Sequence, residues 1–402
     1  MAEVSPLPFD GRKLALVSAA IAVLGFVALG IGLAVDPARA WLSYLMAFVF
    51  VLAISIGGLI LLMIGYAANG RWMAVVRRPI EVLALPLPAL AVLFVPILFG
   101  LSLYPWHTPP AGLEHRELEI LAHRAPYMNG VFFAVRAAIY FAVFLVASEL
   151  LRRWSVRRDR EPPAAGDADP EALLGRERRL SSAMLPPVGL ALTFAAMDWI
   201  MALQPIWYSS IFGIYVFAGG FLAAIGLVTA LAARMWARHG DGGALTPNHF
   251  HALGRLMFAF TVFWAYSAFF QAMLIRIANK PEEITFYIQR IGGAWGVLVW
   301  ILILGHFVLP FLVLMPKGVK FRPRVMAAAG VWLVVMELVD VYWLVIPARV
   351  QGVMVFHWLD LAALAAVGGT AVAVAAWRQH KISLIPHRDP FLPDGAKYRS
   401  NL

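Results

Sequence analysis

Long apolar stretches alternate with short polar ones along the whole chain. A helix needs about 20 apolar residues to cross the hydrocarbon layer of a membrane, and ten stretches come near or exceed that length. They are Leu14–Val35, Trp41–Gly65, Ile80–Leu103, Asn129–Leu151, Ala183–Leu203, Ser209–Met235, Ala252–Ile277, Gly292–Met315, Arg324–Ile346 and Leu359–Trp377. The pattern predicts an all-α, polytopic integral membrane protein with ten transmembrane helices.

Composition supports the membrane class and removes several kinds of site. Of the 402 residues 61% are hydrophobic and 14% charged, whereas soluble domains average about 45–50% apolar and about 25% charged residues. Cysteine is absent from the sequence. Disulfides, thiolate zinc sites, iron–sulfur ligation and covalently attached haem are therefore excluded for this chain.

The basic residues are distributed unevenly between the two sides of the predicted membrane. Of the 33 lysines and arginines, 25 fall on the side of the chain termini and 7 on the other side, with Arg136 inside a span. Because positive loops stay in the cytoplasm, both termini are predicted to be cytoplasmic. The same asymmetry explains the net charge of +10 without nucleic acid as a partner.

One charged, proline-containing stretch divides the chain. Residues 155–182 (SVRRDREPPAAGDADPEALLGRERRLSS) predict a mobile cytoplasmic linker. Spans 1–4 (residues 1–154) precede it, spans 5–10 (183–377) follow it, and residues 378–402 form a cytoplasmic tail.

Two ionisable residues are predicted at similar depth in adjacent spans. Arg136 lies roughly 10 Å below the outer surface in span 4, and Asp198 lies near the same level in span 5. Charged groups inside a membrane are costly and either pair or serve a function. An Arg136–Asp198 ion pair is therefore possible, acting either as a structural staple or in proton or substrate transfer.

A second polar group is predicted near the middle of the membrane. Glu337 and Asp340 are three residues apart on one helix face, and such close carboxylates cannot both ionise cheaply in a low dielectric. His306 lies at a depth that allows it to join them, and Ser267 and Gln271 could extend the ladder outward. The ladder either conducts protons or only hydrogen-bonds the helices together.

The histidines predict no membrane haem. A bis-histidine haem needs two histidines at similar depth on facing helices, and among ten histidines only His306 lies deep in a span. Aromatic pairs such as Trp207–Tyr208 are weak grounds for a quinone pocket. We therefore predict no cofactor bound covalently or by metal ligation.

His251 and Arg255, four residues apart at the inner end of span 7, are interpreted as a membrane-interface anchor.

Specific stretches resemble one family of membrane subunits. They are FAAMDWIMALQPIWYSSIFGIYVFAG (Phe194–Gly219), LGRLMFAFTVFWAYSAFFQAMLIRIANKPEEITFYIQR (Leu253–Arg290), APYMNGVFFAVRAAIYF, GHFVLPFLVLMPKGVK, VDVYWLVIP and HRDPFLPD. These resemble the F subunit of alternative complex III, a bacterial quinol:cytochrome c or cupredoxin oxidoreductase. The resemblance covers most of the chain from about residue 126 onward.

The resemblance implies a fold, a set of partners and a location. It implies two four-helix bundles (spans 2–5 and 6–9) flanked by spans 1 and 10, as in the related polysulfide-reductase membrane anchors. It places the chain in the bacterial inner membrane, beside a multihaem cytochrome c, an iron–sulfur subunit and a paralogous C subunit expected to oxidise quinol. Four candidate proton-pathway residues lie in matching motifs: Arg136, Asp198, His306 and Asp340. Glu337 and Arg276 depart from the expected pattern.

The function expected from these observations is a structural and potentially proton-conducting subunit of a quinol-oxidising complex, non-catalytic and without a redox centre of its own. Two alternatives stay open. A stand-alone proton-coupled transporter would suit the carboxylates of span 9, although the paired broken helices of many transporters are lacking. A quinol-oxidising subunit with its own quinone pocket would suit the aromatics and carboxylates.

Overall fold

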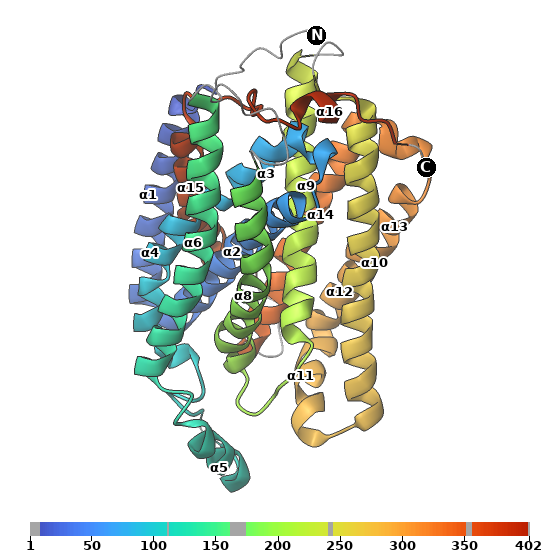
Figure 1. Cartoon of the computed structure of the whole chain (residues 1–402). Coiled ribbons are helices and arrows are strands. Elements are labelled where there is room, and N and C mark those ends of the chain that lie inside the picture. The colour runs from blue at the N-terminus through green and yellow to red at the C-terminus, as the bar shows by residue number, and fades with distance from the viewer. Residues whose placement is uncertain (1–8, 111, 161–173, 240–243, 351–355, 401–402) are drawn as a thin grey trace.

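The computed structural model describes residues 9–110, 112–160, 174–239, 244–350 and 356–400. Within them the chain is all-α, and ten helical segments are long and apolar enough to cross a membrane (Figure 1). The predicted fold class and number of spans are therefore confirmed.

The first five spans come from the N-terminal half. Their elements are α1 (Arg12–Val35), α2 (Pro37–Ala67), η1 (Arg71–Val76), α3 (Arg77–Ala84), α4 (Leu87–Leu93), η2 (Val95–Phe99), α6 (Gly130–Arg160) and α8 (Gly175–Trp199). The short helix α5 (His115–Arg124) lies between the third and fourth spans. The middle of the predicted linker, residues 161–173, lies outside the described residues, and α6 and α8 extend into its two ends.

The other five spans come from the C-terminal half. Their elements are α9 (Phe212–His239), α10 (Pro247–Ala278), α12 (Gly293–Ile301), η6 (Leu302–Val308), α13 (Leu309–Leu314), α14 (Pro323–Val345) and α15 (Trp358–Gln379). Shorter helices outside the spans are α11 (Pro281–Ile291), η7 (Gly318–Phe321) and α16 (Leu392–Ala396).

The third span corrects a prediction. Hydropathy predicts one helix over Ile80–Leu103, but the structure has a series of short segments from η1 to η2, followed by η3 (Leu101–Leu103). Pro79, Pro88 and Pro96 each lie in the first turn of one of these segments. Proline has no amide hydrogen to donate, so it is tolerated at the start of a helix and interrupts a helix interior.

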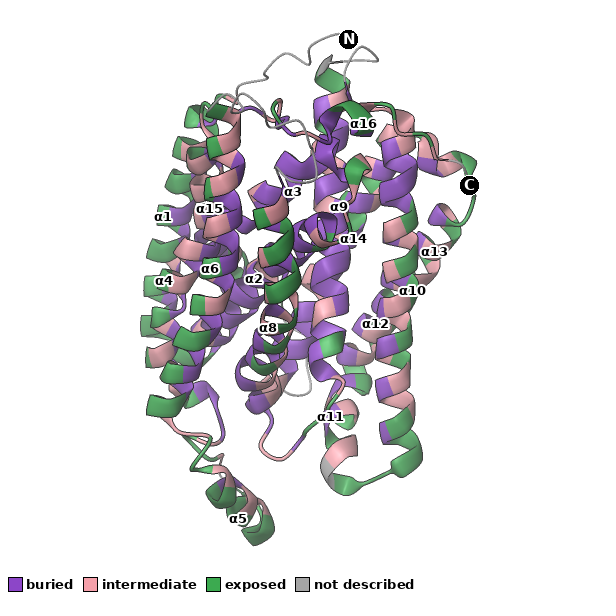
Figure 2. Ribbon diagram, in the orientation of Figure 1, coloured by how far each residue is buried: buried purple, intermediate pink, exposed green. Residues whose placement is uncertain are grey.

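The helices form two bundles and a flanking pair. The segments α2, α3–α4, α6 and α8 pack together, as do α9, α10, α12–α13 and α14, while α1 packs along α15 beside α2. The bundles meet where α9 contacts both α2 and α14, and Figure 2 shows α9 as largely buried there. Gly226 and Gly330 let α9 and α14 approach closely, because a Cβ on Gly226 would lie 2.6 Å from the Gly330 carbonyl oxygen.

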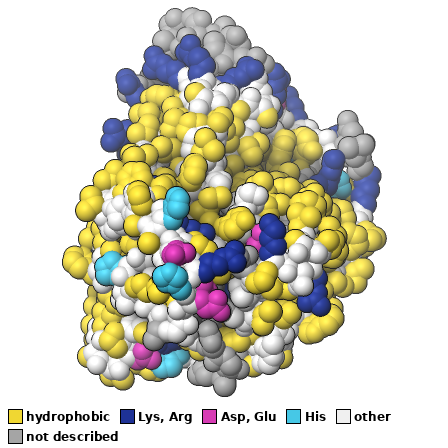
Figure 3. Space-filling model, turned by 90° about the horizontal axis from the view of Figure 1, so that it is seen from below, with side chains coloured by type: hydrophobic (Ala, Val, Ile, Leu, Met, Phe, Trp, Pro, Cys, Tyr) yellow, Lys and Arg dark blue, Asp and Glu magenta, His cyan; other side chains and the backbone are white. Residues whose placement is uncertain are grey.

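Both described ends of the chain lie at the same end of the bundle, here called the N/C end. Phe9 exchanges backbone hydrogen bonds with the C-terminal segment, accepting from Lys381 and donating to Ile382. The helices α5 and α11 lie at the opposite end, here called the α11 end (Figure 1). Seen from that end, Figure 3 shows histidine and charged side chains gathered near the middle of a largely hydrophobic surface.

Candidate functional site

Three ionisable side chains meet inside the second bundle. Glu337 and Asp340 project from α14, and His306 projects from η6. One ligand atom from each of the three lies within 4.8 Å of the others, and each residue is at most 2% exposed. The predicted proximity of these residues is therefore observed, and we call the group the α14 triad.

The backbone around His306 departs from α-helical geometry. Residues Leu302–Val308 form a π-helix, and Pro310 follows four residues after His306. Because Pro310 has no amide hydrogen and its ring crowds the preceding turn, a regular α-helix is disfavoured here. The Trp332 indole nitrogen donates to the Gly305 carbonyl oxygen at 2.7 Å, which satisfies one carbonyl group of the distorted turn. Such π-helical turns are frequent at functional sites.

Two aromatic residues hold Asp340 in place. The Tyr215 hydroxyl on α9 donates to one carboxylate oxygen at 2.5 Å, and the Trp264 indole on α10 donates to the other at 3.0 Å. The Trp264 ring also stacks on the His306 ring, with centroids 4.0 Å apart. Four helices of the second bundle therefore fix the α14 triad, although neither aromatic residue was predicted as part of it.

Glu337 and His306 keep unused hydrogen-bonding capacity. Among the described residues, Glu337 Oε2 and both ring nitrogens of His306 have no hydrogen-bond partner although they are buried. Gly219 on α9 makes room for the glutamate, since a Cβ there would lie 2.3 Å from Glu337 Oε2. A buried polar atom without a hydrogen-bond partner destabilises the fold, so a side chain that keeps such atoms is a candidate functional residue.

The chemistry open to the α14 triad is proton exchange or cation binding. Two neighbouring carboxylates repel each other in a low dielectric, so a proton or a cation favours the site. A carboxyl group of the triad can give its proton to a ring nitrogen of His306 and then take up another, with one water molecule or a side-chain rotation bridging the separation. One imidazole and two carboxylates also suit a divalent metal ion.

The predicted Arg136–Asp198 pair is present in the first bundle. Arg136 Nε and Nη2 donate to the two oxygens of Asp198 at 2.7 and 3.1 Å. The Tyr140 hydroxyl donates to the same carboxylate at 2.8 Å, and Arg136 also donates to the Tyr127 carbonyl oxygen at 2.6 Å. The carboxylate is thus neutralised and hydrogen-bonded, which favours a structural staple between α6 and α8 over a proton-carrying group.

Ser267 and Gln271 bond elsewhere than to the α14 triad. The Ser267 hydroxyl donates to the Phe263 carbonyl oxygen of its own helix at 2.7 Å. Gln271 accepts from the Ser209 hydroxyl at 2.9 Å and donates to the Tyr287 hydroxyl at 3.1 Å. Of the two residues predicted to extend the ladder, only Gln271 makes one of these hydrogen bonds to another helix. That bond lies at the α11 end of the bundle.

Tyr287 on α11 is a residue that the hydropathy pattern did not single out. Burial raises the pKa of Tyr287 to about 12, with its hydrogen bond to Gln271 acting in the opposite direction and the nearby charge of Asp340 adding to the increase. The phenol is therefore protonated at neutral pH and can both donate and accept a hydrogen bond. It lies on the α11 side of Asp340, where a proton leaving the α14 triad toward that end would pass.

Arg290, also on α11, is fully buried beside Tyr287. Its guanidinium donates to the Trp343 and Leu344 carbonyl oxygens at 3.2 and 3.0 Å, in the last turn of α14. Burial lowers the pKa of Arg290 to about 9. From the sequence, Arg290 was predicted only as a cation in the loop between spans 7 and 8. The hydropathy pattern does not show that α11 is buried. Arg290 caps the C-terminal end of α14, where a positive charge is favourable.

A buried ionic network at the N/C end was also missed. Glu81 Oε2 on α3 accepts from Arg78 at 2.6 Å and from Arg152 on α6 at 2.8 Å, and Glu81 Oε1 accepts from the Ser155 hydroxyl at 2.6 Å. Arg152 donates further to Gln379 on α15 at 2.7 Å. Arg78 and Arg152 were counted as loop charges, yet the structure places the network between three helices.

A comparable pair joins α2 to α15 at the α11 end. Arg39 donates to an Asp360 carboxylate oxygen at 2.5 Å, and the Ser43 hydroxyl donates to the other oxygen at 2.6 Å. Both charged residues are at most 6% exposed. The pair neutralises its own charge and marks a helix junction, so it is a structural element and not a second proton site.

Comparison with known proteins adds no assignment to this geometry. No family model and no curated protein matches the chain.

Proposed function

We propose that this chain is a membrane subunit of a quinol:electron-acceptor oxidoreductase of the alternative complex III type, and that it moves protons while other subunits carry the electrons. The observation that carries the proposal is the α14 triad, with His306, Glu337 and Asp340 buried together and with unpartnered proton-accepting atoms. Its aromatic supports Tyr215 and Trp264 lie in the two longest stretches that resemble the family.

The proposed proton route runs from the α14 triad toward the α11 end. Exchange begins between the triad carboxyl groups and the unpartnered nitrogens of His306. Beyond Asp340, the hydrogen-bonded series Tyr287, Gln271 and Ser209 leads to the loop before α9. The Tyr287 and Ser209 hydroxyls can each accept one proton and release another, while the Gln271 amide holds them in place and a water molecule bridges them.

The proposal includes a location and partners. The excess of positive charge at the N/C end supports an orientation with both termini in the cytoplasm. The proposed location, the bacterial inner membrane, follows from the resemblance. The proposed partners are a multihaem cytochrome c, an iron–sulfur subunit and a paralogous C subunit, which supply the redox centres. A resident quinone is not part of the proposal, because Tyr215 and Trp264 already donate to both carboxylate oxygens of Asp340.

The orientation can be tested with reporters. A tag after Leu402 should report from the cytoplasm and a tag near α5 from the outside, because these segments lie at opposite ends of the bundle. Alkaline phosphatase and green fluorescent protein fusions measure this directly. A C-terminal fusion that is active only outside the cytoplasm would reverse the proposed orientation and the direction of proton movement.

Proton conduction can be separated from electron transfer by mutation. Asp340→Asn and Glu337→Gln keep the shape of each side chain but remove the group that titrates. Loss of a positioned acid–base group typically slows proton transfer about 10²–10⁴-fold, so the protons moved per electron should fall while quinol oxidation continues. The measurement is proton uptake and quinol oxidation in vesicles that hold the complex purified through a tag on this chain.

The controls distinguish the competing explanations. Thr261→Val on α10 removes a buried hydroxyl that donates to the Met257 carbonyl oxygen of its own helix, and its proton yield should match the wild type. Recovery of the tagged chain without haem c and iron–sulfur subunits would contradict the proposed complex. An unchanged proton yield in the intact double variant would make the carboxylates structural. A stoichiometric divalent metal lost in Asp340→Asn would identify a metal site instead.

A further inference from the structure

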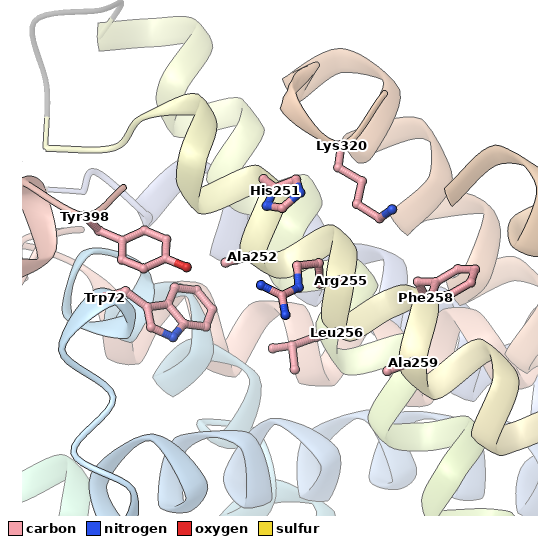
Figure 4. Close-up of a pocket in the computed structure, with 9 residues that line it drawn as sticks. All are labelled: Trp72, His251, Ala252, Arg255, Leu256, Phe258, Ala259, Lys320 and Tyr398. Atoms are coloured by element: carbon pink, nitrogen blue, oxygen red, sulfur yellow. The ribbon is translucent and has the colours of Figure 1, made fainter. Parts of the chain in front are cut away.

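An open pocket of about 620 Å³ lies at the N/C end, outside the α14 triad. It forms where the first turns of α10 meet η1, η7 and the C-terminal segment, as Figure 4 shows. Trp72 and Tyr398 lie together on one side of it, with ring centroids 5.9 Å apart. Arg255 on α10 and Lys320 on η7 line it. In Figure 4 the Arg255 guanidinium points toward Trp72 and Tyr398, and the Lys320 side chain points toward Phe258. The position of Arg255 in the sequence predicts only a membrane-interface anchor.

The pocket carries positive charge that its own walls do not balance. None of its lining residues is acidic, and in the described parts of the chain neither Arg255 nor Lys320 forms an ion pair. Burial, together with the neighbouring charge of Arg255, lowers the pKa of Lys320. Lys320 Nζ donates to the Met315 carbonyl oxygen at 3.1 Å, which leaves two of its three donors available. An anion would relieve this repulsion.

An apolar surface continues from the pocket along α10. Arg255 lies eight residues after the start of α10 at Pro247, or roughly 12 Å along the helix. Below it, on the same outward face, follow Ala259, Val262, Tyr266 and Phe269, of which the last three are 40%, 56% and 67% exposed. A cationic head and an apolar stripe therefore share one helix face, running from the N/C end into the span.

We propose that this pocket binds the phosphate of an anionic glycerophospholipid from the leaflet at the N/C end. The phosphate sits between Arg255 and Lys320, and an acyl chain lies on the outward face of α10. The lack of a carboxylate in the pocket favours an anionic headgroup over one that also carries an ammonium group. Trp72 and Tyr398 suit the headgroup level, where amphipathic aromatic side chains gather. A free phosphate ion would use the cations and leave the stripe unused.

The test measures lipid binding to the delipidated full-length chain in detergent by native mass spectrometry. The probes are phosphatidylglycerol and phosphatidylcholine of equal chain length. Two basic residues near the phosphate should make phosphatidylglycerol bind about tenfold or more tightly than phosphatidylcholine. Arg255→Gln combined with Lys320→Gln should remove this preference, and Arg255→Lys should keep most of it, which separates loss of charge from loss of folding.

Arg324→Gln is the matched control, because Arg324 is an exposed cation at the start of α14 that does not line the pocket. It should leave the preference unchanged. Equal binding of the two lipids by the wild type, or an equal loss in Arg324→Gln, would overturn the proposal. Displacement of phosphatidylglycerol by millimolar inorganic phosphate would also overturn it, since it would identify a site for the free anion.

Discussion

Replacing Arg136 with alanine is expected to lower the free energy of unfolding by about 3–5 kcal/mol, because it leaves a buried carboxylate without its cation. Arg136 and Asp198 are 5% and 1% exposed, so water cannot replace the lost partner cheaply. The two hydrogen bonds from the guanidinium to Asp198 are lost together, and the Tyr140 hydroxyl still donates to the carboxylate. The single substitution should therefore damage the first bundle more than its volume change alone would.

The double variant gives the sharper comparison. Arg136→Ala combined with Asp198→Ala removes both charges, so it should cost less than the sum of the two single substitutions. Unfolding of the purified chain by increasing detergent denaturant, followed by circular dichroism, measures this. Arg276→Ala on the exposed end of α10 is the control, and its change should stay within about 0.5 kcal/mol. Strictly additive losses would contradict a coupled pair.

The sequence predicted contacts between side chains correctly where the depth of each residue in the membrane decides which side chains can reach one another. Arg136 and Asp198 were predicted at one level of adjacent spans, and the structure joins them. Glu337 and Asp340 share a helix face because they are three residues apart, and the depth of His306 allowed it to reach them. Helical rise and hydropathy contain this information, so it could be predicted from the chain alone.

Rotation about the helix axis was not predictable in the same way. Ser267 and Gln271 have suitable depths, but one bonds to its own helix and the other to Tyr287. The supports of Asp340, Tyr215 and Trp264, come from two other helices whose facing sides only tertiary packing fixes. In a membrane span both the lipid-facing and the buried sides are apolar, so hydropathy does not separate them.

Charges near the span ends were misjudged for a related reason. Arg78 and Arg152 were counted as loop residues in the positive-inside comparison, where only the side of the membrane matters. In the structure they are 0% and 7% exposed. Whether a flanking cation faces water or an interhelical junction depends on its partner carboxylate. Glu81 lies three residues after Arg78 on α3, but it lies 71 residues before Arg152, which it meets across the bundle. Sequence distance gives no signal of that contact.

Glu81 is the centre of that junction, and its removal is the second large effect. Its two oxygens accept hydrogen bonds from Arg78, Arg152 and Ser155, and the side chain is 2% exposed. Glu81→Ala leaves both guanidinium groups buried with one anionic partner fewer. Stranding a buried charge typically costs about 3–5 kcal/mol, so we expect a loss in that range and a weaker attachment of α3 to α6.

Two further variants show whether the charge or the shape of Glu81 matters. Glu81→Gln keeps an oxygen that can accept from an arginine, so it should cost less than Glu81→Ala. Glu149→Ala is the matched control on α6, because the Glu149–Arg378 pair is 26% and 23% exposed, and partly solvated pairs contribute only about 0–1 kcal/mol. All three are compared in the same detergent titration. A Glu81→Ala loss no greater than that of Glu149→Ala would mean that the bundle end is held by apolar packing, with the buried charges contributing little to its stability.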